Sequence, residues 1–447
     1  MRKIISIIAC KLSILIGNIM GKKSSSTPGK IALKICPNIL ELLAQNVTKK
    51  TIAVCGTNGK TTTSNVICDA LEHENNTVIC NRHGANMLPG VVTAFISATN
   101  IWGTGKSDYA VIEVDENSAP VIFSQLNIDY IVVTNFFRDQ LDRYGEIDVS
   151  IGKVEEGVKN APNAVMVLNA DDPLVVSSNF GDNRRIYFGV GEKVSGGNED
   201  ETREGRYCRN CGEAIEYDFF QYSQLGHYKC SGCDFKRPAA DYEATDFSFR
   251  GVFTKFKVAG RTADIKIRGF YNVYNMLAAF AVSSDIGLSA ESVLDVFREI
   301  KTQTGRMEEY RMEKPVIFNL SKNPAGFNQT VDTIVRTPGK KAVVMVLNDN
   351  AQDGKDISWI WDVNMERLAD ENLEYFVACG TRALDLVVRL KYCDFDLDKV
   401  KHTKSVELAV SQACAQEVDI VYVLVNYTAL FTTEKVLKRL EEKALCV

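Results

Sequence analysis

The sequence predicts a doubly wound α/β protein built from two successive units, and three observations indicate this fold. From residue 51, short apolar runs alternate with helix-length segments, as expected for a mostly parallel sheet covered by helices on both faces. A similar alternation returns after residue 341. Between about 195 and 240 the pattern is interrupted by a stretch rich in glycine and charge that leads into four cysteines, which indicates an insertion.

Each apolar run marks a predicted strand, and the segments between the runs are predicted helices. The first unit closes with a clear helix pattern over 270–287. The second unit ends in a helix over 433–445. The predicted strands are 51–55, 76–80, 109–114, 130–135, 164–169 and 184–190 in the first unit, and 341–348, 374–379 and 419–426 in the second.

The composition is that of an ordinary globular protein. The chain has 447 residues, 45% of them hydrophobic and 24% charged, which is long enough for two or three domains. A net charge of −5 gives no electrostatic reason to bind nucleic acid. Of the 13 cysteines, all but one cluster of four are scattered singly, which favours a reducing cytoplasm over a disulfide scaffold.

The N-terminal segment, MRKIISIIACKLSILIGNIM, has a basic start and an apolar run like those of a signal peptide or anchor. Lys11 interrupts the run and no small-residue cleavage site follows cleanly, so a spanning helix is not expected. Two hypotheses stay open for this helix: it packs on the protein body, or it lies on the inner surface of a membrane. A polar linker follows at 22–30.

A glycine-rich loop follows the first predicted strand. The general phosphate-binding loop has a glycine where Val54 stands, but the shortened Gly-x-x-Gly-Lys-Thr keeps the essential features. Its glycines let backbone amides approach phosphates, and the following helix N-terminus supplies positive potential. Lys60 is expected to reach the outer phosphates of ATP, and the Thr61 hydroxyl to ligate Mg²⁺. The predicted nucleotide contacts are Gly56, Thr57, Asn58, Gly59, Lys60, Thr61 and Thr62.

Polar residues at the ends of the next strands complete this predicted site. Glu113 ends the strand 109–114, where its carboxylate would meet Mg²⁺ at the carboxyl edge of the sheet. Asp115 and Glu116 are alternatives that we expect to be exposed to solvent. Asn135 ends the following strand.

Six motifs in chain order resemble those of the Mur ligase superfamily, ATP-dependent amide-bond ligases of cell-wall and folate metabolism. The resemblance runs continuously from residue 50 to about 310 and implies a central ATPase domain followed by a Rossmann-like C-terminal domain. The motifs are GTNGKTTT (56–63), EVDE (113–116), TNFFRDQLDRYGE (134–146), NADDP (169–173), FYNVYNMLAA (270–279) and TGRME (304–308).

The resemblance also assigns roles and boundaries. It implies that Glu113 binds the metal, that Asn272 lies on the adenine side, that Asp171 and Asp172 lie near the nucleotide, and that Arg306 opens the C-terminal domain. We therefore expect an N-terminal helical segment and linker at 1–50, a central domain at 51–305 and a C-terminal domain at 306–447. The insertion would occupy about 201–240 of the central domain.

Three departures from the superfamily stand out. The loop begins near residue 56, which leaves no room for the N-terminal UDP-recognising domain of typical members. The segment 139–142 lacks the histidine of the superfamily's corresponding motif. No lysine matches the carbamylated lysine of typical members, since Lys153 is only near that position.

The four clustered cysteines have the spacing Cys-x2-Cys-x18-Cys-x2-Cys, which predicts one tetrahedral, structural Zn²⁺ site. A redox pair needs only one Cys-x-x-Cys, and the acidic residues beside the cluster disfavour a nucleic-acid ribbon. His227 is an alternative ligand, although we expect it to be a surface residue. The predicted ligands are Cys208, Cys211, Cys230 and Cys233.

Together with the cysteine ribbon and NLSKNPAGFNQTV (319–331), the segment DNAQDGKDISWIWD (349–362) resembles the ligase-like subunits of lipid II isoglutaminyl synthases. This implies ATP-dependent amidation of the D-glutamate α-carboxylate of the lipid II stem peptide to D-isoglutamine, through an acyl phosphate. A folylpolyglutamate synthase-like ligase is the alternative. An RNA-binding module is disfavoured because no basic-aromatic stripe is present.

Ammonia from glutamine requires a cysteine nucleophile and a histidine base, and none of the four histidines lies in such a setting. The resemblance implies a separate GatD-like glutaminase that forms a heterodimer with this chain. Such a pair needs a carboxylate to orient its imidazole, and we hypothesise that Asp356, then Asp353 and Asp349, supplies it. Trp359 and Trp361 would either anchor that interface or lie in the core.

Overall fold

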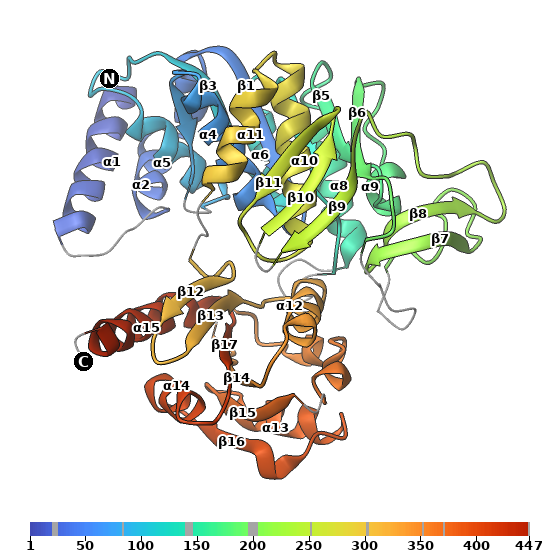
Figure 1. The fold of residues 1–447 in the computed structure, drawn as a ribbon. Helices are drawn as coiled ribbons and strands as arrows, with labels where there is room; N and C mark the ends of the chain where they lie inside the picture. Colours follow the sequence, from blue (N-terminus) through green and yellow to red (C-terminus); the bar gives the residue numbers. More distant parts are fainter. Residues whose placement is uncertain are drawn as a thin grey trace.

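The structure is a computed structural model that describes residues 1–19, 26–82, 85–138, 146–194, 204–250, 253–300, 304–350, 353–369 and 372–445. Figure 1 shows a larger α/β unit, coloured blue to yellow, above a smaller one coloured orange to red. The larger unit is built on a nine-stranded sheet and the smaller one on a six-stranded sheet. The predicted doubly wound α/β class is confirmed in both.

The nine-stranded sheet has the order β11-β10-β9-β6-β5-β4-β1-β3-β2. All pairs from β9 to β2 are parallel, whereas β9, β10 and β11 pair antiparallel. Its strands are β1 (Val47–Cys55), β2 (Val78–Cys80), β3 (Ser107–Glu113), β4 (Tyr130–Val133), β5 (Val165–Asn169), β6 (Arg185–Val190), β9 (Tyr242–Arg250), β10 (Phe253–Val258) and β11 (Arg261–Ile265).

Alternate residues of the central strands enter two separate cores, as the pleat of a strand requires. Ile52 and Val54 of β1 pack with helices on one face, and Ala53 and Cys55 pack with helices on the other. The first face carries α4 (Lys60–His73), α10 (Tyr271–Asp285) and α11 (Ala290–Glu299). The second face carries α5 (Leu88–Ser97), α6 (Ala119–Phe123), α8 (Ile147–Val158) and α9 (Pro173–Val176). The 3-10 turn η1 (Glu116–Ser118) follows β3.

The N-terminal helices belong to the second core. One face of α1 packs there through Ile7 and Cys10, and the Ser6 hydroxyl donates to Ala32 O at 3.1 Å. The first hypothesis for this segment, packing on the protein body, therefore holds for one face of α1. No helix among the described residues is long and apolar enough to cross a membrane. These helices are α1 (Arg2–Ile19), α2 (Thr27–Ile35) and α3 (Ile39–Ala44).

The region of the predicted insertion forms a separate two-stranded hairpin, β7 (Ile215–Tyr222) and β8 (Leu225–Cys230), which projects from one end of the larger unit (Figure 1). The antiparallel extension β9–β11 that follows was not predicted. Its strands alternate exposed and buried residues, as in β10, where Thr254, Phe256 and Val258 are buried. One-sided strands of this kind give a weaker sequence signal than the continuously apolar parallel strands.

The smaller sheet has the order β12-β13-β17-β14-β15-β16 and is parallel except for β12. The three strands predicted for this unit, 341–348, 374–379 and 419–426, are confirmed as β14, β15 and β17. The strands β12, β13 and β16 were not predicted. The elements are β12 (Glu308–Arg311), β13 (Pro315–Leu320), β14 (Lys341–Val346), β15 (Leu373–Cys379), β16 (Val400–Thr403) and β17 (Ile420–Val425), with α12 (Pro324–Arg336), α13 (Ala383–Lys391), α14 (Val406–Cys414), α15 (Leu430–Leu445) and the 3-10 turns η2 (Ser358–Trp361), η3 (Met365–Leu368), η4 (Leu397–Lys399) and η5 (Tyr427–Ala429).

Candidate active site

The glycine-rich loop connects the end of β1 to the start of α4, and two of its glycines are required by the backbone. Gly56 and Gly59 have φ angles of 112° and 89°, in a region that residues with a side chain rarely adopt. A Cβ on Gly59 would lie 2.0 Å from Asn275 Oδ1, and one on Gly56 would lie 2.4 Å from Thr134 Oγ1. Both positions therefore need glycine for conformation and for space.

Asn135, at the end of β4, holds the middle of this loop. Its Oδ1 accepts from Asn58 N at 2.9 Å, and its Nδ2 donates to Asn58 O at 3.0 Å. The backbone N–H of Thr57 donates to Asn135 O at 2.9 Å, and the Thr57 hydroxyl donates to Phe137 O at 3.0 Å. These bonds hold the loop against the end of β4, where the sequence predicts Asn135.

Lys60 is the first residue of α4, and its ammonium group is buried. Nζ donates to Gly56 O at 2.6 Å and forms an ion pair with Glu116 Oε1 at 2.9 Å. The same carboxylate oxygen accepts from Gly56 N at 3.0 Å. Although burial opposes the charge, Glu116 and then Glu113 raise the pKa of Lys60, so the group carries its charge at neutral pH.

The expectation that Asp115 and Glu116 are exposed to solvent is wrong. Their exposed fractions are 6% and 5%. Glu116 is buried because it is the counterion of Lys60, and Asp115 is buried because it begins η1, where its carboxylate accepts from Asn117 N at 3.2 Å. A buried ammonium needs such a partner, and the sequence contained no signal for which acid would serve.

Glu113 and Thr61 lie next to each other at the carboxyl edge of the sheet. The Thr61 hydroxyl donates to Glu113 Oε2 at 2.7 Å, and Asn86 Nδ2 donates to Glu113 Oε1 at 2.9 Å. Asn81 fixes the backbone of Glu113 by accepting from its N–H at 2.8 Å and donating to its carbonyl at 2.9 Å. A carboxylate and a hydroxyl beside the loop are oxygen donors of the kind that Mg²⁺ prefers, so these residues fit that ion.

Asp171 and Asp172 are fully buried at the end of β5 and contact protein groups. Asp171 accepts from Arg237 Nε at 2.7 Å and from the Tyr274 hydroxyl at 2.7 Å. Asp172 accepts from Phe136 N at 2.8 Å and begins α9 by accepting from Leu174 N. Burial raises the pKa of Asp172 to about 7. Asp172 therefore fixes the backbone next to Asn135, and Asp171 ties the end of β5 to α10 and to Arg237.

The two other residues that the resemblance singles out lie on α10 and just before β12. Asn272, on α10, accepts from Asn275 Nδ2 at 3.0 Å, and Asn275 abuts Gly59. Arg306 lies just before β12, and its charge acts on Tyr271 at the start of α10. Lys153 is a partly exposed residue of α8 that pairs with Glu156 at 2.7 Å. The segment 139–142 lies outside the described residues.

Two polar contacts join the units at the loop. Asn323, the N-cap of α12, exchanges two hydrogen bonds with the side chain of Asn58, at 3.0 and 3.4 Å. Arg138, just beyond Asn135, pairs with Asp362 of the smaller unit at 3.3 Å. Neither role was predicted, although Asn-Pro at 323–324 is a recognisable helix-start signal.

Between the units lies a small pocket lined by Phe137, Arg138, Glu204, Ser223, Pro324, Ala325, Asn328 and Asp362.

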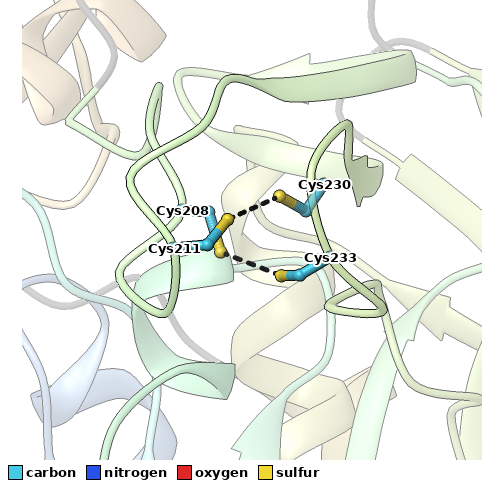
Figure 2. A group of neighbouring side chains, drawn as sticks. All are labelled: Cys208, Cys211, Cys230 and Cys233. Atoms are coloured by element: carbon cyan, nitrogen blue, oxygen red, sulfur yellow. Dashed lines mark hydrogen bonds between the residues drawn. The ribbon is translucent and has the colours of Figure 1, made fainter.

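The four cysteines of the insertion meet at the base of the hairpin, and Figure 2 shows their sulfur atoms pointing toward one another. All four Sγ atoms lie within 4.8 Å of each other, with 3.7 Å between Cys208 and Cys233 and 3.4 Å between Cys211 and Cys230. These separations exceed a disulfide bond and are close to the ~3.8 Å between thiolates around a tetrahedral zinc ion. The cluster therefore has the geometry of a closed four-thiolate metal site.

His227 is not part of this cluster. Its Nε2 lies 2.8 Å from Val190 O, and its ring stacks on Phe219 at 4.3 Å. It is half-buried, so the expectation of a surface position holds only in part.

The hairpin beyond the cysteines reaches back to the loop. Gln224, at its turn, donates to Phe136 O at 2.6 Å, one residue from Asn135. Gly226 N donates to Asp171 O at 3.0 Å, and the Tyr228 hydroxyl donates to Ala170 O at 3.2 Å. The hairpin that leads into Cys230 and Cys233 therefore contacts the same strand ends as the candidate nucleotide site.

The aspartates of 349–362 have distinct environments. Asp353 is 2% exposed, and Thr428 donates to it through its backbone N–H and its hydroxyl. Asp349 accepts from the Thr381 hydroxyl at 2.8 Å and pairs with Arg382 at 3.3 Å. Asp356 is half-buried and accepts a hydrogen bond from Ser358 N at 2.8 Å. This bond is the largest of the causes that lower the pKa of the Asp356 carboxyl.

The two tryptophans of this segment face opposite environments. Trp359 is 7% exposed and packs edge-on against Phe327 of α12, so it belongs to the core. Trp361 is 48% exposed, lies edge-on to Tyr392 at 5.5 Å and stacks under the guanidinium of Arg389 at 5.3 Å. The core hypothesis holds for Trp359, and only Trp361 offers an exposed aromatic surface.

Comparison with known proteins places the chain in a family. Residues 54–231 match the Mur ligase middle domain, and residues 320–430 match the family described as MurT ligase C-terminal. Two curated relatives are called lipid II isoglutaminyl synthase (glutamine-hydrolyzing) subunit MurT. The protein from Staphylococcus aureus is 37% identical over 96% of each chain, and that from Streptococcus pneumoniae is 33% identical over 93% of this chain and 92% of its own.

Solved structures share the fold. A pseudomurein peptide ligase type C from Methanothermus fervidus has a TM-score of 0.69 at 22% identity, covering 89% of this chain and 80% of that one. MurF ligase from Thermotoga maritima in complex with ADP has a TM-score of 0.65 at 14% identity, covering 92% and 84%. The Mur ligase-like α/β architecture is therefore established for this chain.

Replacing Gly59 by alanine should abolish nucleotide binding, because the new Cβ would meet Asn275 and strain a left-handed backbone by about 1–3 kcal/mol. Titration with a fluorescent ATP analogue measures the effect. Gly152→Ala is the matched control: this residue lies within α8 with nothing within 4 Å of an added Cβ, so binding should be unchanged and stability slightly higher. Unaltered affinity of Gly59→Ala would contradict the assignment of the loop.

Proposed function

The chain belongs to the MurT family, and on that premise we propose that it is the ATP-dependent synthetase subunit of a glutamine-hydrolysing lipid II isoglutaminyl synthase. Its reaction is amidation of the D-glutamate α-carboxylate of the lipid II stem peptide to D-isoglutamine, in peptidoglycan synthesis. The observation that carries the proposal is 37% identity over 96% of both chains to a relative of that name, together with a preformed phosphate-binding loop.

The loop supplies what the first half of such a reaction needs. A carboxylate is a poor electrophile, so its oxygen must first receive the γ-phosphoryl group of ATP, which gives an acyl phosphate and ADP. The Lys60 ammonium, held charged beside Glu116, and the N-terminal end of α4 would stabilise the negative charge that develops on the phosphoryl oxygens. Ammonia then attacks the acyl carbon, and phosphate leaves.

Thr61 and Glu113 would hold Mg²⁺. When bound, the ion neutralises charge on the phosphate oxygens of the nucleotide. Asn81 and Asn86 fix the Glu113 backbone and side chain and so set the position of its carboxylate. Asn135 keeps the loop in register with β4 through Asn58.

The remaining assignments follow from the same family. Asn272 and Arg306 would lie near the nucleotide, with Asp171 and Asp172 supporting the strand edge beneath it. The central domain would extend from 51 to 305, with the cysteine ribbon inserted in it, and a Rossmann-like domain would follow from 306. The enzyme would act in the cytoplasm.

A second subunit would supply ammonia. A GatD-like glutaminase is the partner proposed here, joined to the chain in a heterodimer, with an aspartate of 349–362 orienting its catalytic imidazole. Asp356 stays the first choice because its side chain is fixed by the bond from Ser358 N at the start of η2, the turn that also carries the exposed Trp361. Asp353 is less suited, since Thr428 already takes both of its oxygens.

The four cysteines would bind one structural Zn²⁺. The distances between sulfurs support a closed tetrahedral site, and the Gly232 N–H donates to Cys230 Sγ at 3.3 Å, a bond that favours the thiolate. Because all four positions are filled by thiolates, the metal would have no catalytic role. It would instead stabilise the hairpin whose turn binds Phe136 O.

The test of function supplies the purified chain with Mg-ATP, ammonium and lipid II, and measures amidated product and phosphate. Product and phosphate should form in equal amounts. Lys60→Ala should lower the rate about 100-fold or more, because the transferred phosphoryl group loses its buried cation. Lys159→Ala, at an exposed lysine after α8, should not change the rate. Intact ATP-dependent amidation by Lys60→Ala would refute the site.

The zinc assignment predicts about one zinc per chain by elemental analysis. Cys208→Ser combined with Cys211→Ser should remove the metal and lower Tm by about 5 °C or more, since a structural zinc site contributes several kcal/mol. Cys414→Ser, at a partly exposed cysteine of α14 outside the cluster, should keep both zinc and Tm. A zinc-free protein from metal-supplied cells would refute the prediction.

The glutaminase hypothesis predicts a selective defect. Alone, the chain should amidate with ammonium but not with glutamine; with its partner it should use both. In the assembled complex, Asp356→Asn should lower glutamine hydrolysis about 100-fold or more and leave ammonium-driven amidation near normal.

Asp396→Asn is the matched control for this experiment, because Asp396 caps η4 through Asp398 N at 3.0 Å in the way that Asp356 caps Ser358 N. It should affect neither activity. Loss of ammonium-driven amidation in Asp356→Asn would place this residue at the ATP side, and loss of neither activity would make it only a cap.

A further inference from the structure

The first helix has two apolar faces, and the protein covers only one of them. Ser6, Ile7 and Cys10 are buried against the N-terminal core. The opposite face repeats apolar side chains every three or four residues, the spacing of one side of a helix. These side chains, here called the α1 face, are 40 to 98% exposed: Met1, Ile5, Ile8, Leu12, Leu15, Ile16 and Ile19.

The α1 face lies where nothing else in the described structure packs on it. Figure 1 shows α1 at the outer edge of the larger unit, at the end opposite the hairpin β7–β8. Beside the first turns of the helix, the loop at 101–103 contacts Lys3 and Ile7 through Gly103 and exposes Ile101 and Trp102, at 50% and 63%. An exposed apolar stripe of this length is unusual for a surface that faces only water.

The charged residues of the N-terminal helices are mostly positive. Among the described residues 1–19 and 26–44 there are five cations and a single carboxylate, Glu41, whereas the whole chain has a net charge of −5. Positive charge is therefore concentrated at this edge of an acidic protein. The cations are Arg2, Lys3, Lys11, Lys30 and Lys34.

We propose that the α1 face docks on the surface of an anionic lipid bilayer. The apolar stripe would enter the boundary between headgroups and acyl chains, with α1 parallel to the bilayer plane, and the surrounding cations would pair with lipid phosphates. A second copy of the chain fits less well, because a symmetric contact through this face would bring the same cations together. Docking would place the enzyme where the lipid-linked substrate of the proposed function resides, but the inference itself rests on the exposed face and its charge.

Vesicle co-sedimentation of the full-length chain tests this proposal without any turnover. Phosphatidylglycerol-containing vesicles should bind the chain, pure phosphatidylcholine vesicles should bind it weakly, and about 0.5 M salt should reduce binding. The variant Ile8→Gln/Leu12→Gln/Leu15→Gln keeps good helix formers and should bind about tenfold less or lower. The matched control, Val121→Gln/Val149→Gln/Leu408→Gln, changes three residues of 48, 50 and 49% exposure elsewhere and should bind normally.

Equal binding by the unmodified chain and the α1-face variant, or no binding to anionic vesicles, would overturn the proposal. A dimer seen by light scattering that the variant abolishes, without vesicle binding, would assign the face to a second copy and overturn it as well. Ammonium-driven amidation of detergent-solubilised lipid II by the same variant keeps the two proposals distinguishable. A normal rate with failed docking would leave the proposed function intact, whereas an inactive unmodified chain that still binds vesicles would refute only that function.

Discussion

The burial of the Lys60 ammonium is the constraint on which the rest of the candidate active site depends. A cation with 8% exposure is stable only with a fixed counterion, and Glu116 provides it while also accepting from the loop amide of Gly56. Glu116 can do so because β3 ends at Glu113 and the chain turns at once into η1. One strand end therefore supplies both the counterion of the lysine and the carboxylate beside Thr61.

The loop is also the place where three separate parts of the chain converge. The hairpin turn donates to Phe136 O, α12 of the smaller unit meets Asn58 through Asn323, and Asp362 reaches Arg138. These partners come from distant parts of the sequence, so the segments around Asn58 and Asn135 contact both the hairpin and the smaller unit. If the four cysteines hold the proposed zinc ion, that ion would support catalysis only indirectly, through the hairpin contact next to the candidate nucleotide loop.

The sequence predicted those features whose physical signal is local. Continuous apolar runs located the parallel strands, because these are buried on both faces, and the glycine-lysine-threonine run marked the loop between β1 and α4. The one-sided strands β9–β11 were missed because their alternation is short. The burial of Asp115 and Glu116 and the pairing of Asp171 with Arg237 were missed because each depends on a partner distant in sequence. No local sequence pattern indicates which of several carboxylates will pair with a buried cation.

The segment 349–362 shows why an acidic, aromatic stretch needs more than one explanation. Trp359 enters the core with Phe327, whereas Trp361 lies on the surface under Arg389, a buried arginine that also donates to Ile360 O and Val363 O. Each of three aspartates has its own partner. Asp349 forms an ion pair at the N-terminal end of α13, Asp353 accepts a hydrogen bond from Thr428, and Asp362 forms an ion pair with Arg138. Anchors on both sides hold the intervening turn, so a partner subunit would meet a preformed surface and lose little entropy in ordering it. Because Asp362 also pairs with Arg138, this segment is linked to the strand end that lies next to the candidate nucleotide loop.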